Sequence, residues 1–132
     1  AARLREAGLT APEPVQGDWT AASGYAAGER LAADPEVTAV FCANDEVAIG
    51  LIRAMHEHGR RVPQDVSVVG FDGLSLGEYS FPPLTTVRQD FRRAGSEMVG
   101  LVLEQVDSGV GGGARQILIP TELVVRGSTA SA

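Results

Sequence analysis

The chain has 132 residues and a formal net charge of -6. Its hydrophobic fraction of 44% is typical of a globular chain rather than a disordered one, and its acidic balance argues against broad nucleic-acid binding by these residues. No apolar run approaches the ~18 residues that span a bilayer, and the opening stretch AARLREAGL has no signal-peptide character. That stretch reads as the end of a helix without an initiator Met, so we expect a segment of a longer protein.

The first predicted elements are a helical turn over residues 1–7 and a short strand at residues 15–16. Thr20 is a candidate N-cap, because its hydroxyl can accept a hydrogen bond from the first turn of a helix. The helix that it would open covers residues 21–33 and is rich in Ala and Gly. We expect these small residues to allow a close approach to a sheet.

Residues 38–72 predict one complete strand–helix–strand unit. The first apolar run ends at Asn44, whose side-chain oxygen can cap a helix over residues 45–58. A second apolar run, residues 66–71, ends at Asp72. Two buried strands joined by a helix are most simply parallel, with a right-handed crossover. We therefore predict an α/β fold with a parallel sheet flanked by helices.

The rest of the chain continues the alternation of strands and helices. The loop over residues 73–83 is unusually apolar for a surface segment and leads to a short strand over residues 84–88. Residues 91–106 have the clearest 3.6-residue periodicity of the sequence and predict an amphipathic helix. A glycine-rich turn and two short strands complete the prediction, at residues 109–113, 116–119 and 122–125.

Residues that could support catalysis or bind a metal occur in unfavourable settings. His56 and His58 lie two positions apart on a predicted helix, so their imidazoles point in different directions and cannot share an ion. Cys42 lies in the middle of a predicted buried strand, which favours an inert thiol. The glycines at 109–113 do not open a helix after a strand, and no serine follows the nucleophile-elbow pattern. We expect no enzyme activity, no metal and no cofactor.

Polar and aromatic residues follow the ends of three predicted strands. They are Asp18-Trp19, Asn44-Asp45 and Asp72. The carboxyl ends of strands in an open α/β sheet are where ligands bind. A flat indole beside carboxylate and amide groups suits a sugar, whose C–H face packs on the ring while its hydroxyls meet the polar groups. Taken singly, Asn44 and Asp72 are each better explained as caps of the next helix or turn, but together with Trp19 at the same edge they favour a binding site.

Four strings, in this order and spacing, resemble the effector-binding core of LacI/GalR-type transcriptional regulators: AVFCANDEVAIG, RRVPQDVSVVGFD, PPLTTVRQDF and ELVVRGST. The resemblance runs from GDW at 17–19 to RGST at 126–129. It implies a periplasmic-binding-protein-like type I fold with two lobes and an effector in the cleft between them. The family's ligand-contacting positions fall on Trp19, Asn44 and Asp72, and in some members also on Gln89.

The resemblance also implies how the chain is divided. Residues 1–88 would form the C-terminal lobe, and residues 89–115 a crossover helix and linker that belong partly to an N-terminal lobe. Residues 116–132 would be closing strands and a tail. The family's DNA-binding headpiece, its hinge helix and an effector-contacting arginine fall outside this chain. Gly73 stands where an acidic or amide residue is common in the family, so the resemblance does not carry over that one polar contact.

The partners implied are a small effector, operator DNA bound through the absent headpiece, and a second copy of the chain, in the cytoplasm and without membrane contact. A two-fold contact is also suggested by Ile49, which faces away from the predicted buried side of its helix next to an apolar loop. A scattered surface isoleucine is the alternative. The predicted dimer face consists of Ile49, Arg53, Leu74, Leu76, Tyr79 and Phe81.

The apolar face of helix 91–106 has no sheet of its own in the resembled fold, because it packs there on the N-terminal lobe. Leaving a large apolar side chain in water forfeits roughly 1.5–3 kcal/mol. If these residues were the whole molecule, we would expect the helix to fold back on its own lobe or to pack against another copy. In a longer chain, the other lobe should border it.

Two further functions stay open. A periplasmic sugar-binding protein of a transport system shares the lobe, but not usually the strings PPLTTVRQ and VVRGST. A flavodoxin-like enzyme would need a phosphate-cradling first loop, which the sequence lacks.

Overall fold

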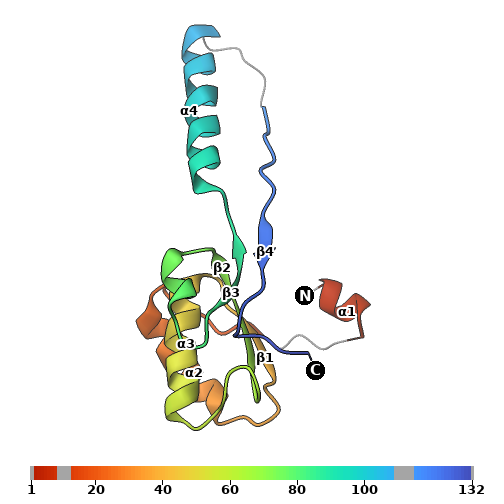
Figure 1. Ribbon diagram of the computed structural model, residues 1–132. Helices are drawn as coiled ribbons and strands as arrows, with labels where there is room; N and C mark the ends of the chain where they lie inside the picture. The colour runs from red at the N-terminus through yellow and green to blue at the C-terminus, as the bar shows by residue number, and fades with distance from the viewer. Residues whose placement is uncertain (1, 9–12, 109–114, 132) are drawn as a thin grey trace.

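The structure is a computed structural model that describes residues 2–8, 13–108 and 115–131 (Figure 1). Its four-stranded sheet has the order β1 (Ala39–Phe41), β2 (Ser67–Asp72), β3 (Thr85–Arg88) and β4 (Glu122–Val124). Strands β1, β2 and β3 are parallel, and β4 runs antiparallel to β3. The α/β prediction is confirmed, with β4 as the one antiparallel strand of a mixed sheet.

Two helices cover the sheet in succession. Helix α3 (Asp45–Glu57) packs against β2, and α2 (Ala21–Ala32) packs against α3. A Cβ on Gly24 would lie 2.1 Å from the carbonyl oxygen of Val47 in α3, so only glycine permits this approach. The expectation that the small residues of α2 approach the sheet is therefore wrong, because they approach α3.

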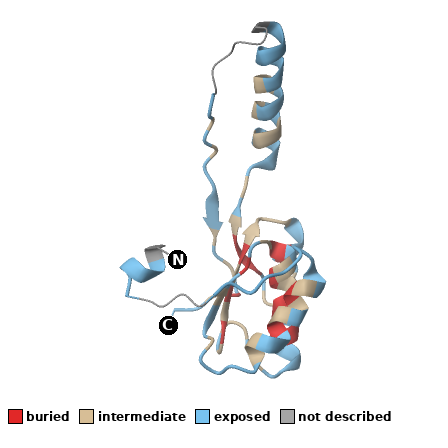
Figure 2. Ribbon diagram, turned by 180° about the vertical axis from the view of Figure 1, so that it is seen from behind, coloured by how far each residue is buried: buried red, intermediate tan, exposed pale blue. Residues whose placement is uncertain are grey.

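The hydrophobic core lies between α3 and the sheet. Leu51 and Met55 of α3 meet Val68 of β2 and Leu84 before β3, and all four are at most 2% exposed. In Figure 2 most of the buried residues gather along this contact, while α4 and the segment 115–121 are half-buried or exposed. The side of α3 that carries Leu51 and Met55 thus packs on the sheet.

Two predicted strands are absent, although the helices agree closely with the sequence. Helix α1 (Ala2–Glu6) opens the described chain, but residues 13–18 that follow contain no strand where one was predicted at 15–16. Residues 116–119 likewise carry no strand. Both segments have β-type sequences, but a strand also needs a neighbouring strand, and neither segment pairs with one among the described residues. The predicted turn at 109–113 lies outside the described residues.

The apolar loop after β2 is partly helical. Residues Ser75–Glu78 form a 3-10 helix, η1, and Gly77 within it is buried against Leu84. The prediction of an irregular loop over residues 73–83 missed this helix. No helix of the described residues is long and apolar enough to cross a membrane.

Helix α4 (Phe91–Ser108) stands away from the lobe, with the segment 115–121 returning beside it (Figure 1). We call these two segments the α4 arm. The pairing of β3 with β4 directs both continuations away from the sheet, so α4 does not fold back on the lobe. Contact of α4 with another copy or with a second lobe stays a prediction. Six large apolar side chains of α4 are 57–72% exposed on the single chain: Phe91, Met98, Val99, Val102, Leu103 and Val106.

The end of the chain returns between two neighbouring strands. The backbone carbonyl of Ser128 accepts a hydrogen bond from the Val68 amide at 2.8 Å. Its hydroxyl donates to the Val68 carbonyl at 2.6 Å and accepts from the Thr85 amide at 2.8 Å. Ser128 is fully buried and links β2 to β3 just before the two strands begin to pair directly.

Candidate functional site

The carboxyl ends of β1, β2 and β3 lie side by side at the sheet edge from which the α4 arm rises (Figure 1). Asn44 follows β1, Asp72 ends β2, and Gln89 follows β3. All three are half-buried, which leaves part of each side chain accessible. The parallel order of the strands thus brings together three residues that are far apart in the sequence.

Asn44 joins the predicted aromatic residue to this edge. Its side-chain amide donates to the carbonyl oxygen of Trp19 at 2.9 Å, and its side-chain oxygen accepts from the Val47 amide at 2.8 Å. Asn44 is therefore the N-cap of α3 and also the residue that holds the Trp19 turn. The indole of Trp19 itself is 66% exposed and free to meet a ligand.

Asp18, also at the predicted strand end, is engaged within its own turn. Its carboxylate accepts from the Thr20 hydroxyl at 2.6 Å and from the Thr20 amide at 3.1 Å. These hydrogen bonds, together with Ser23, lower the pKa of Asp18 below its usual value. Thr20 in turn caps α2 by accepting from the Ser23 amide. We therefore assign Asp18 to the turn that presents Trp19.

Asp72 interacts with the strand next to its own. Its Oδ1 accepts from the Gln89 side-chain amide at 2.7 Å, and its backbone carbonyl accepts from the Gln89 amide at 3.2 Å. No described residue donates a hydrogen bond to Oδ2, so that oxygen is available to a ligand. Among the described residues only Gln89 donates a hydrogen bond to the Asp72 carboxylate. Asp72 is therefore not the cap of a helix or turn.

Trp19 and Asp72 share an unusual backbone. They are the only non-glycine residues with positive φ in the described parts of the chain, at 71° and 101°. A side chain in this region costs of order 1–3 kcal/mol and persists only where its surroundings hold it. Such residues cluster at functional sites, so the backbone strain and the predicted binding residues coincide.

Asp45 was predicted beside Asn44 at the ligand edge, but it is fully buried behind that edge and cannot meet a ligand there. Its two carboxyl oxygens accept from the Leu74 amide and from the Thr86 hydroxyl, both at 2.6 Å. No signal in the sequence predicts these two hydrogen bonds, because the partners lie 29 and 41 residues away from Asp45.

Cys42, His56 and His58, the residues considered for catalysis or metal binding, do not form a site together. Burial raises the pKa of the Cys42 thiol to about 12, and the nearby Asp45 adds to this shift. His58 uses Nδ1 to contact the Ala54 carbonyl, and His56 is exposed on the surface of α3. Within the described ranges, no three His, Cys, Asp or Glu side chains gather as a metal site would require.

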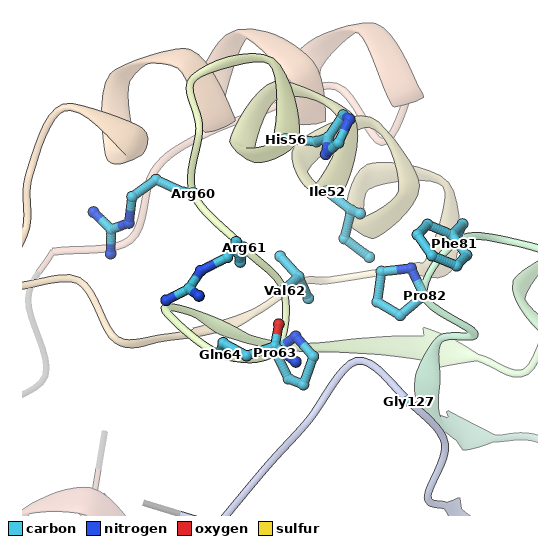
Figure 3. Close-up of a pocket in the computed structure, with 10 residues that line it drawn as sticks. All are labelled: Ile52, His56, Arg60, Arg61, Val62, Pro63, Gln64, Phe81, Pro82 and Gly127. Carbon is cyan, nitrogen blue, oxygen red and sulfur yellow. The ribbon is translucent and has the colours of Figure 1, made fainter.

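A hollow of about 450 Å³ lies on another part of the lobe, beside the carboxyl-terminal half of α3 (Figure 3). Ile52, Val62 and Pro82 supply its apolar wall. Its two arginines are already engaged: Arg60 donates to backbone carbonyls of residues 34 and 37, and Arg61 pairs with Asp65 at 2.7 Å. The hollow contains none of the predicted ligand residues, so we place the site at the strand ends.

The predicted dimer residues fall into two groups. Leu76, Tyr79 and Phe81 are 60%, 82% and 92% exposed, and Arg53 is exposed while paired with Glu57 at 2.9 Å. Ile49 and Leu74 are half-buried, and Ile49 packs against the hydrophobic core. The description of Ile49 as an outward-facing residue is therefore only partly right.

Comparison with known proteins identifies the family of this chain. Residues 1–129 match the family described as periplasmic binding protein-like domain. The HTH-type transcriptional repressor PurR of Vibrio atlanticus is 41% identical over 106 residues, which cover 78% of this chain and 32% of PurR. The chain thus spans about a third of that curated relative.

Two solved structures superpose closely. The Lac repressor dimer bound to operator and the anti-inducer ONPF matches with a TM-score of 0.87 and 35% identity, over 98% of this chain and 45% of that one. The complex of the transcriptional regulator CelR with cellobiose matches with a TM-score of 0.89 and 36% identity, over 96% and 39%. Both likenesses extend over the lobe and the arm together.

Proposed function

The chain belongs to the family of periplasmic binding protein-like domains, as the effector-binding part of a LacI/GalR-type regulator, and we propose that it senses a sugar-like molecule at the carboxyl edge of its sheet. The proposed role is binding and not catalysis. It would control a transcriptional repressor that acts on DNA in the cytoplasm.

One observation carries this proposal: hydrogen bonds tie the four predicted ligand residues together in pairs at one edge. Asn44 holds the Trp19 turn, and Gln89 holds Asp72. The exposed indole offers a flat surface for the C–H face of a sugar ring, while Oδ2 of Asp72 can accept hydrogen bonds from hydroxyls. The cellobiose complex of the related CelR supports a sugar as the effector class.

The α4 arm would connect this lobe to a second one. Its exposed apolar side chains need a cover, and α4 begins two residues after Gln89 of the proposed site. We infer that residues 89–115 belong partly to an N-terminal lobe that closes over the effector. Closure would then change the geometry of a DNA-binding headpiece, which lies outside these residues.

A second copy of the chain would pair through the exposed residues of the η1 region. Tyr79 and Phe81 together present aromatic surface that a monomer has no reason to expose. Arg53 lies on the neighbouring helix α3, and its pairing with Glu57 leaves a polar rim. The Lac repressor related in structure is a dimer, which supports a two-fold contact here.

Calorimetry of the full-length protein tests the binding proposal. The ligands are cellobiose, lactose, sucrose, glucose, galactose, ribose, adenosine and cytidine. Asp72→Ala should weaken the sugar that binds by about 1–3 kcal/mol, the cost of removing one partner of a hydrogen bond to a charged group. Asp65→Ala is the matched control, because Asp65 is also half-buried but precedes the amino end of β2. Equal affinities in the two variants would contradict the assignment of Asp72.

A mobility-shift assay tests the regulatory part. The full-length protein should retard DNA from its own promoter, and the sugar found by calorimetry should change that retardation. A full-length sequence with a signal peptide and without a helix-turn-helix would instead support a transport protein.

A further inference from the structure

The buried side chain of Asp45 connects three elements that frame the proposed site. Asp45 is the first residue of α3 and has no exposed surface. One carboxyl oxygen accepts from the Thr86 hydroxyl of β3 at 2.6 Å, and the other from the Leu74 amide at 2.6 Å. Leu74 follows β2 by two residues, so one side chain joins α3, β3 and the turn that contains Asp72.

The turn at Asp72 needs such an anchor. Asp72 has a φ of 101°, and the next residue, Gly73, has a φ of 78°. A Cβ on Gly73 would lie 2.7 Å from Cγ of Arg88, so the turn runs tightly along β3. A backbone of this kind persists only where neighbouring groups fix it on both sides. Pairing of β2 with its neighbours fixes the entry to the turn, and Asp45 fixes the exit at Leu74.

The surrounding sequence leaves room for this side chain. A Cβ on Gly70 would lie 2.2 Å from Oδ1 of Asp45, closer than any real contact. Gly70 is in the middle of β2, where glycine weakens a strand, so its presence has a packing reason. The position of Asp45 at the amino end of α3 is also favourable, because a negative side chain there meets the positive end of the helix dipole.

We infer that Asp45 is a positioning residue of the effector site, which holds the strained Asp72 turn and the Asn44 cap in a fixed relation without touching the effector itself. The inference rests on the proposed function, since it concerns the same site. It predicts that loss of Asp45 loosens the turn more than it loosens the lobe.

Hydrogen–deuterium exchange of the full-length protein tests this prediction without any ligand. In Asp45→Ala, the peptide over residues 72–78 should exchange about tenfold faster, the change that corresponds to one lost hydrogen bond to a charged group. Asp45→Asn should restore slow exchange, because its oxygen can accept from Leu74 and its amide can donate to Thr86. Asp45→Ser, which is well tolerated at a helix start but too short to reach both partners, replaces Asp45→Ala if that variant does not fold.

Ser128→Ala is the matched control. Ser128 is equally buried and also bonds to β2 and β3, but it does not contact the Asp72 turn. It should lower the melting temperature without faster exchange over residues 72–78. Equal exchange of that peptide in Asp45→Ala and Ser128→Ala, at matched loss of melting temperature, would overturn the inference.

Calorimetry with the same eight compounds completes the test. A sugar that binds the unchanged protein should bind Asp45→Ala about tenfold more weakly and Asp45→Asn almost equally well, following the same lost hydrogen bond. Unchanged affinity in Asp45→Ala would contradict a positioning role even if the turn exchanges faster. If none of the eight compounds binds the unchanged protein, the proposed effector class fails, while the exchange result still decides whether Asp45 holds the turn.

Discussion

The side-chain amide of Gln89 donates to Oδ1 of Asp72 at 2.7 Å and so joins the end of β2 to the residue that follows β3. Gln89 is also where the chain leaves the lobe for the α4 arm. A ligand that hydrogen-bonds to Oδ2 of Asp72 would therefore lie next to Gln89, where the chain passes from one proposed lobe to the other. Binding and lobe movement would then share one hydrogen-bonded pair.

The strain at Asp72 gives the first prediction. Asp72→Gly and Asp72→Ala remove the same carboxylate, but only glycine adopts a φ of 101° without a steric penalty. We expect the Gly variant to be more stable than the Ala variant by about 1 kcal/mol or more, and both to lose effector affinity. Urea unfolding of the full-length protein measures the difference. A more stable Ala variant would show that the turn is not strained.

The second prediction concerns the closing segment. Ser128→Ala leaves the buried Thr85 amide and Val68 carbonyl without their side-chain partner, at a cost of about 1–3 kcal/mol for an unsatisfied buried group. Ser131→Ala serves as the control, because Ser131 is exposed. Unfolding in urea should separate the two variants clearly. If they unfold at the same concentration, the link between β2 and β3 contributes little.

The dimer face gives the third prediction. Phe81→Glu places a charge on a side chain that is 92% exposed in the single chain, so it should not affect folding but should break an apolar two-fold contact. Sedimentation of the full-length variant should show monomers, and Phe81→Leu should remain a dimer. Ile49→Glu is also expected to yield monomers, but it tests the face less cleanly, because Ile49 packs against the core. If Phe81→Glu dimerises with unchanged affinity, the interface must lie on another part of the protein.

The fourth prediction concerns pH. Burial raises the pKa of Cys42 from an ordinary value of 9.0 to about 12. Between these values the folded protein keeps a proton that the unfolded chain loses, so the free energy of unfolding falls as pH rises. The stability that the protonated Cys42 thiol allows is fully present below pH 9.0 and is lost as pH rises to about 12. Cys42→Ala should unfold with a flatter pH dependence over this window, measured against the unchanged protein. Parallel curves would show that the thiol titrates normally.

Local signals in the sequence predicted much of this molecule. Asn44 caps α3 as its position suggested, and α3 ends before Gly59, whose φ of 74° suits glycine. Trp19, Asn44, Asp72 and Gln89 could be named because each follows a recognisable apolar run or a family string. Such features depend on residues within a few positions of one another, so one stretch of sequence contains the relevant information.

The tertiary structure decided what depends on distant partners. Residues 15–16 and 116–119 have strand-like sequences but lack neighbours, whereas Ser128, in a segment predicted as a polar tail, is buried between two strands. The role of Asp45 follows from Leu74 and Thr86, which no spacing rule connects to it. Hydrogen bonds between strands and across turns join positions far apart in the chain. These hydrogen bonds form only when the whole lobe is packed, so they cannot be predicted from any single segment of the sequence.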